Sequence, residues 1–247
     1  MIGIIGGTGL SQLNGFSVKE QKWLETPFGE PSSMLSFGDY QGCSLVFLAR
    51  HGVPHKVAPH LINYRANLSA LKQVGVTKII AINSVGGIHP DLGPTEIAVP
   101  DQIVDYTYGR ASTVYDGCHV ESVDHIDFSF PYTQALRQAL LNACSSLNIK
   151  CLAQGTYAAT QGPRLETAAE IKRLKADGCD MVGMTGMPEA ALAREFGLDY
   201  ACLALSVNWA AGLTKQVITM KDIEAALQVG MSKVHLILRE CLNSNLV

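Results

Sequence analysis

The chain has 247 residues, of which 47% are hydrophobic and 17% are charged, so it is long enough to bury the core of one large α/β domain. Its 19 basic and 22 acidic residues give a formal net charge of -3, which excludes an overall electrostatic attraction to DNA, RNA or anionic lipid. A small-molecule substrate is therefore the default, and we expect a single domain over residues 1–247.

Two further features limit where and how the protein works. No apolar run approaches the ~20 residues that a membrane span requires, and residues 1–4 lack the basic start of a secretory signal, so we expect a cytoplasmic protein. The seven cysteines include no C-x-x-C pair, which argues against a disulfide framework and a thiolate zinc site.

The first predicted element is a buried strand over 2–5 that runs into the glycine turn Gly6-Gly7-Thr8-Gly9. Two more buried strands, over 43–49 and 78–83, each precede an unusual loop: 50–52 after the first and 84–87 after the second. Between them, apolar residues at spacings of three and four predict an amphipathic helix that ends near Gly75.

The second half of the chain continues the same pattern after a loop over 89–118. We expect a helix from Pro131 to about Leu147, a strand over 150–160, helices over 167–176 and 188–196, strands over 181–184 and 200–207, and a terminal helix over 221–243. Strands and helices thus alternate throughout, which is typical of an α/β fold, and no repeat or linker divides the chain.

The glycine turn has the ingredients of an anion-binding nest, because glycines let backbone N–H groups converge and the Thr8 hydroxyl adds a donor. It is not a P-loop, since no Lys-Ser/Thr pair follows, and Gln12 stands where a dinucleotide fingerprint needs its third glycine. A purely structural tight turn is the alternative interpretation.

Arg50 and His51 follow directly after a buried strand. A guanidinium at a strand end can fork onto two phosphate oxygens, whereas the alternative is a surface ion pair. A metal site built on His51, His55 and His60 is not expected, because Pro54 and Pro59 interrupt the segment and it holds no carboxylate.

Two other segments, each following a predicted strand, could also bind an anion. Residues 83–87 bring small side chains to a strand end, where backbone amides can approach a ligand; a plain turn is the alternative. Thr185 places a hydroxyl near the start of a helix, where the partial positive charge favours an anion. Three such junctions and one arginine together indicate a phosphate site.

At this point the chain resembles a known family, the trimeric purine nucleoside and 5'-methylthioadenosine phosphorylases. The resemblance covers nearly the whole chain, through motifs at 6–10, 50–52, 63–67, 83–87, 161–167 and 184–189. It implies a single α/β domain with a central mixed, partly barrel-like β-sheet flanked by helices. Gly186 departs from the threonine that is usual in the family.

The resemblance also implies roles for individual residues. Phosphate would be held by Thr8, Arg50, His51, the Ser84 backbone amide and Thr185, with His55 close by. Met184 would lie against the ribose, and Leu165 stands where an aromatic side chain often packs on the base. His125 would reach into the neighbouring subunit's site, which implies a homotrimer or a dimer of trimers. Inorganic phosphate would be a co-substrate, with no metal or organic cofactor.

Two polar residues point to a 6-oxopurine base. Asn208, at a strand end, can accept from N7–H and donate to O6, whereas adenine-specific family members place an aspartate there. An ionised Glu166 can accept from N1–H of hypoxanthine but would face the bare N1 lone pair of adenine. The alternatives are a helix-start carboxylate for Glu166 and a turn former for Asn208.

The 5' end of the sugar is expected to face an apolar wall. Met220 falls where nucleoside enzymes of the family carry a histidine, and Met220 with Ile223 suits a methylthio group; plain core packing is the alternative. The expected substrate is S-methyl-5'-thioinosine. The rival interpretations are a 5'-methylthioadenosine phosphorylase, an inosine/guanosine phosphorylase, and a nucleotide-binding regulatory module without catalysis.

Overall fold

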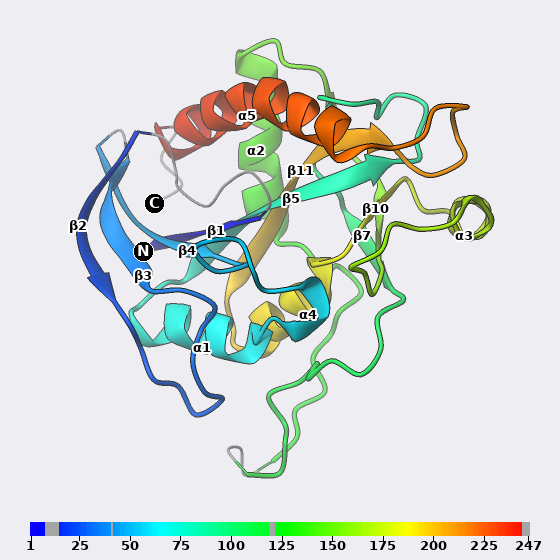
Figure 1. The fold of residues 1–247 in the computed structure, drawn as a ribbon. Helices are drawn as coiled ribbons and strands as arrows, with labels where there is room; N and C mark the ends of the chain where they lie inside the picture. Colours follow the sequence, from blue (N-terminus) through cyan, green and yellow to red (C-terminus); the bar gives the residue numbers. More distant parts are fainter. Residues whose placement is uncertain (8–14, 41, 119–121, 244–247) are drawn as a thin grey trace.

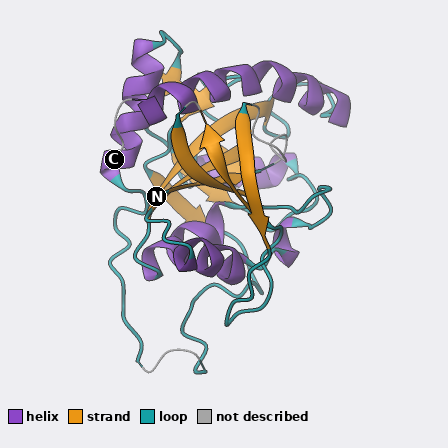
Figure 2. Ribbon diagram, turned by 90° about the vertical axis from the view of Figure 1, so that its left-hand side faces the viewer, coloured by secondary structure: helices purple, strands orange, loops and turns teal. Residues whose placement is uncertain are grey.

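The computed structural model describes residues 1–7, 15–40, 42–118 and 122–243. Its strands all join one sheet, with helices on both faces (Figures 1 and 2). The strands are β1 (Ile2–Gly6), β2 (Phe16–Lys22), β3 (Leu35–Tyr40), β4 (Cys43–Ala49), β5 (Lys78–Gly87), β6 (Ile97–Ala98), β7 (Gln102–Asp105), β8 (Cys151–Leu152), β9 (Thr156–Ala159), β10 (Met181–Gly183) and β11 (Asp199–Trp209). The helices are η1 (Pro59–Leu61), α1 (Tyr64–Gln73), α2 (Gln134–Ser146), α3 (Ala168–Ala176), α4 (Gly186–Glu195) and α5 (Met220–Asn243).

Four parallel strands, in the order β4, β1, β5, β11, form the centre of the sheet. β3 pairs antiparallel with β4, and β2 with β3. At its far end β5 also pairs antiparallel with β10, which continues into β9 and β7. β6 and β8 extend from β11. The expected α/β fold with a mixed sheet flanked by helices is confirmed.

Side chains on the two faces of the sheet belong to different cores, because neighbouring residues of a strand point to opposite sides. Ile4 packs in the core under α2 and α5, which lie along one face (Figure 1), whereas Ile5 packs in the core under α1 and α4. β5 repeats this with Ile80 and Ile79. In the described part of the chain, no helix combines the length and apolarity needed to cross a membrane.

The expected alternation of strands and helices is wrong near the N-terminus, where β1 to β4 follow one another and residues 1–7, 15–40 and 42–50 contain no helix. β2 escapes sequence analysis because its residues from Ser17 to Lys22 are all exposed, so it has no apolar alternation. The backbone ladder with β3 holds it in place instead.

Other boundaries also differ from expectation. Residues 84–87 are not a loop but the end of β5, because β11 and β10 pair with them. The expected loop over 89–118 contains β6 and β7, and the expected strand over 150–160 is two strands separated by a break at 153–155. The helix expected from Pro131 begins at Gln134.

Candidate active site

A cavity of about 380 Å³ opens where the central strands end, a size within the usual range of small-molecule sites. Most of the residues singled out in the sequence line it, although they are scattered over 174 positions from first to last. They are Arg50, His51, His55, Ser84, Leu165, Glu166, Met184, Thr185, Asn208, Met220 and Ile223.

Strand register explains why the phosphate candidates meet. Gly6 on β1 is paired with Ala49 on β4, and Ile5 with Ala81 on β5, so the residues that follow emerge side by side. β10 runs antiparallel to β5, with Val182 opposite Gly86, and its end therefore returns toward the middle of β5. This brings Thr185 to Asn83, whose Nδ2 donates to the Thr185 hydroxyl over 3.0 Å.

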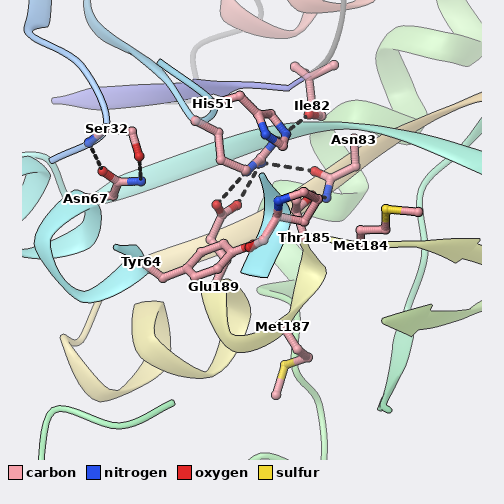
Figure 3. Close-up of polar contacts among 12 residues, drawn as sticks. Ser32, His51, Tyr64, Asn67, Ile82, Asn83, Met184, Thr185, Met187 and Glu189 are labelled. Atoms are coloured by element: carbon pink, nitrogen blue, oxygen red, sulfur yellow. Dashed lines mark hydrogen bonds and ion pairs between the residues drawn. The ribbon is translucent and has the colours of Figure 1, made fainter. Parts of the chain in front are cut away.

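Arg50 is completely buried, and its paired arms hold a carboxylate of the protein itself. Nε donates to Glu189 Oε2 over 2.7 Å and Nη2 to Glu189 Oε1 over 2.8 Å, while Nη1 donates to the Ile82 carbonyl and Nη2 also to Asn83 Oδ1. Figure 3 shows Glu189, Ile82 and Asn83 grouped around these contacts. The expected fork onto two phosphate oxygens is therefore not the arrangement of this structure, and neither is a surface ion pair.

The donor-only guanidinium sets the direction of the next hydrogen bonds. Asn83 must turn Oδ1 toward Arg50, which leaves Nδ2 to donate to Thr185. The Thr185 oxygen is then an acceptor from Asn83, and its own proton is available to the cavity. Thr185 precedes α4 as its N-cap residue but makes no side-chain capping bond.

His51 is buried and neutral. Its Nδ1 lies 2.8 Å from the Val57 carbonyl, which only accepts, so Nδ1 carries the proton and Nε2 has a free lone pair. Burial lowers the pKa of His51 to about 4, and burial also lowers the pKa of His55. The two rings stack with centroids 4.2 Å apart. His51 is thus suited to accept a hydrogen bond from a protonated phosphate oxygen rather than to act as a cation.

Glu166 also lines the cavity and lies on the segment before α3. Thr160 Oγ1 donates to Glu166 Oε1 over 2.7 Å, which leaves Oε2 to accept from a ligand. The start of α3 is capped by Thr167 and Glu170, which form a reciprocal capping box. Capping therefore does not explain Glu166.

Asn208 owes its direction to a β-bulge. The pairing of β11 with β5 shifts register between Ser206 and Asn208, so Val207 and Asn208 both line the cavity although they are neighbours in the chain. One Asn208 Nδ2 hydrogen is donated to the Trp209 carbonyl over 2.8 Å. Asn208 lies inside a strand, so the turn-former interpretation is wrong.

The remaining wall is apolar. Met184 packs against Gly162, whose missing side chain provides the space. Leu165 is 42% exposed and Met220 63% exposed, while Ile223 is buried in the core under α5. Met220, the first residue of α5, is not a core residue, so simple packing does not account for it.

Two of the predicted site residues are Thr8 and His125. Thr8 lies outside the described residues. His125 is exposed and does not line the cavity; it belongs to the long connection between β7 and α2 that extends away from the sheet in Figure 1. Among the described residues, no group of three or more His, Cys, Asp or Glu side chains is arranged to hold a metal ion.

Sequence analysis assigned no role to three residues that organise the site: Asn83, Glu189 and Arg110. Arg110 donates to the carbonyls of Thr160 and Gln161 and to those of Met184 and Met187, so it joins the two sides of the cavity. Nothing in its polar surroundings in the sequence signals this. A buried arginine requires a carboxylate partner, but the local sequence does not indicate that Arg50 is buried or that Glu189 is its partner.

The short side chain at Gly186 has a local cause. A Cβ at this position would lie 2.9 Å from Ile103 Cδ1 and 2.9 Å from Tyr157 Cε1. These side chains fill the space that a threonine would need. The departure from the family motif therefore reflects packing behind the cavity.

Comparison with known proteins agrees with this geometry. The model of the Phosphorylase superfamily matches residues 1–243. The chain is 54% identical over 242 residues to a Pseudomonas syringae pv. tomato protein named "Probable S-methyl-5'-thioinosine phosphorylase", covering 98% of each chain. It is 40% identical to a Pyrococcus furiosus protein named "6-oxopurine nucleoside phosphorylase", covering 92% of this chain and 86% of the other.

The fold is similar to that of solved structures as well. Methylthioadenosine phosphorylase from Schistosoma mansoni in complex with adenine superposes with a TM-score of 0.94 at 32% identity, covering 98% of this chain and 91% of that one. This chain therefore belongs to the phosphorylase superfamily.

Proposed function

We propose that this protein is a pentosyltransferase that cleaves S-methyl-5'-thioinosine with inorganic phosphate, releasing hypoxanthine and 5-methylthioribose 1-phosphate. The observation that carries the proposal is the meeting of Glu166, Asn208 and Met220 in one cavity with Arg50 and Thr185. The 54% identity to the P. syringae relative named for this reaction supports it.

The proposed chemistry follows from the charges that develop. As the C1'–N9 bond breaks, the bonding electrons leave with the purine and the sugar becomes oxocarbenium-like. An oxygen of hydrogen phosphate then forms the new bond to C1', and the proton that this phosphate loses balances the proton that the base takes up at N7. Donors fixed in place before the reaction, such as the Thr185 hydroxyl, stabilise the charged groups without reorganisation. The proposed reaction uses phosphate as its nucleophile and calls for no metal or organic cofactor.

The base side of the cavity supports hypoxanthine. Glu166 has one oxygen held by Thr160 and one left to accept from N1–H. Asn208 uses one of its two Nδ2 hydrogens for Trp209, and it retains the other for O6 and its carbonyl oxygen for N7–H. Adenine would leave Glu166 facing a lone pair, and such mismatches are strongly disfavoured in buried sites.

The sugar side supports a methylthio group. Met220 and Ile223 offer apolar atoms and no hydrogen-bond donor or acceptor strong enough to hold a 5'-hydroxyl. Met184 and Leu165 continue this apolar wall. We further propose that 1–247 acts as one domain in the cytoplasm, as a homotrimer or dimer of trimers in which His125 of one subunit completes the site of another.

A substrate panel tests the function. Methylthioinosine, methylthioadenosine and inosine are incubated with the purified protein in phosphate and in phosphate-free buffer, and released base is measured. Methylthioinosine should have the highest kcat/KM, and release should require phosphate. Preference for methylthioadenosine, or equal release without phosphate, would refute the proposal. A regulatory module without catalysis would release no base at all.

A further inference from the structure

Glu189 is a buried carboxylate outside the cavity wall that has no part in the chemistry described so far. It lies on α4, is fully buried, and accepts three hydrogen bonds from two residues: two from the arms of Arg50 and one from the Tyr200 hydroxyl at 2.8 Å. A bidentate carboxylate–guanidinium pair fixes both groups in one plane. Glu189 therefore dictates how Arg50 is oriented.

The donor inventory of Arg50 shows what this leaves for an anion. A guanidinium has five N–H groups, and the bonds to Glu189, Asn83 and Ile82 use four of them. The fifth is on Nη1. Nη1 lies 2.8 Å from where a Cβ on Gly7 would be, so only glycine allows the strand end to approach Arg50 this closely.

The charges around the cavity also show that Glu189 limits the attraction of Arg50 for an anion. Among the described residues that line it, the ionised side chains are Arg50, Lys56 and Glu166, and His51 is neutral as argued above. Glu189 offsets the charge of Arg50 at a distance of 2.7 Å. An anion entering the site thus meets oriented hydrogen-bond donors rather than an uncompensated buried cation.

We propose that Glu189 is a positioning residue of the phosphate site: it occupies the fork of Arg50 and offsets its charge, so that phosphate is held moderately and in one orientation. This inference rests on the proposed function. Binding energy spent equally on bound phosphate and on the transition state does not raise kcat. A site that holds phosphate less tightly but fixes its donors therefore favours turnover.

Glu189→Gln tests the proposal, because the amide cannot accept from both arms and no longer offsets the charge. Inorganic phosphate and sulfate are titrated calorimetrically into the wild type and the variant, and kcat is measured at saturating phosphate. We expect phosphate to bind about tenfold more tightly and kcat to fall about tenfold, since an uncompensated charge next to a dianion is strongly felt in a buried site. A purely structural role would weaken binding; unchanged or weaker binding in a folded variant overturns the proposal.

Glu189→Asp keeps the charge but is one methylene shorter and cannot hold both arms from the same position. We expect kcat to fall while phosphate affinity stays within about twofold of the wild type, because the charge is still offset. This variant decides the question if Glu189→Gln does not fold: a wild-type kcat, or a large loss of phosphate affinity, overturns the proposal.

Tyr132→Phe is the matched control. Tyr132 is buried and stacks on Tyr200 with ring centroids 6.1 Å apart, and its hydroxyl has no hydrogen-bond partner among the described residues. Losing it alters the same core without touching Glu189, so phosphate affinity and kcat should both be unchanged. Failure of the proposed function would show as no phosphorolysis by the wild type, whereas failure of this inference would leave the wild type active.

Discussion

In the proposed function, the choice of base depends on Asn208 and Glu166. Both present carbonyl or carboxylate oxygens to the cavity, and each has one hydrogen bond that fixes its orientation, to Trp209 and from Thr160 respectively. Their roles follow from donor and acceptor counts rather than from shape, because hypoxanthine and adenine are nearly the same size.

Asn208→Asp should move the preference toward adenine nucleosides. A carboxylate accepts from N7–H and from the adenine amino group but repels O6 of hypoxanthine. We expect the ratio of kcat/KM for methylthioinosine to that for methylthioadenosine to fall by about tenfold or more. Asn142→Asp is the control: Asn142 is exposed on α2, and its Oδ1 only accepts from Gln138. Unchanged selectivity of Asn208→Asp would remove Asn208 from the base site.

His51 should make stability depend on pH in acid. Its pKa is lowered to about 4 by burial, from an unfolded value near 6.5, so the unfolded chain binds the extra proton first. The contribution of His51 to the free energy of unfolding is fully present above about pH 6.5. It is lost as pH falls toward 4, by an amount on the order of 2–3 kcal/mol. Urea unfolding of the wild type and His51→Asn between pH 4 and 7 measures this. Parallel curves for the two proteins would contradict it.

At the scale of elements, different residues of the segment from β9 to α3 orient Glu166 and begin α3. Thr160 positions Glu166 toward the cavity, while Thr167 and Glu170 begin α3. Arg110 fastens the same segment to the junction of β10 and α4 through backbone carbonyls. One short stretch thus connects the proposed base side of the site to the proposed phosphate side.

Thr160→Val should raise the KM for methylthioinosine about tenfold, because Glu166 loses the donor that orients it, and it should leave the KM for phosphate unchanged. Thr167→Ala is its counterpart: loss of the cap should cost about 1 kcal/mol of stability with little effect on either KM. Steady-state kinetics with each substrate varied in turn distinguishes the two. Equal effects of both substitutions on methylthioinosine KM would show that only the helix start matters.

For the whole molecule, the prediction concerns the shared site. A His125→Ala variant and a Glu166→Ala variant should each have low activity, but mixing them after mild dissociation and reassociation should restore activity. In a random equal mixture about a quarter of the sites carry an intact Glu166 and an intact neighbouring His125. Activity is measured before and after subunit exchange, with sedimentation to establish the trimer. No gain after verified exchange would place His125 outside the neighbour's site.

How well the sequence predicts secondary structure differs from one element to another. The buried strands β1 and β4 and the helices α1 and α3 were predicted within a few residues, because apolar runs and periodic patterns are local signals. The sequence does not predict β2, because its side chains are exposed, and it predicts a loop at the end of β5, where the glycines instead pair with β10 and β11. The pairing partner, not the local sequence, holds these residues extended.

The order and chemistry of the motifs were determined by the sequence alone: which side chains meet at strand ends, and why a guanidinium, a hydroxyl, a carboxamide and a carboxylate suit a phosphate and a 6-oxopurine. Only the tertiary structure decided how these groups are used. The fork of Arg50 faces Glu189, 139 positions along the chain, and Asn208 faces the cavity because of a shift in register between two strands. Hydrogen bonds are directional and contacts between distant segments depend on register, so neither could be read from local pattern.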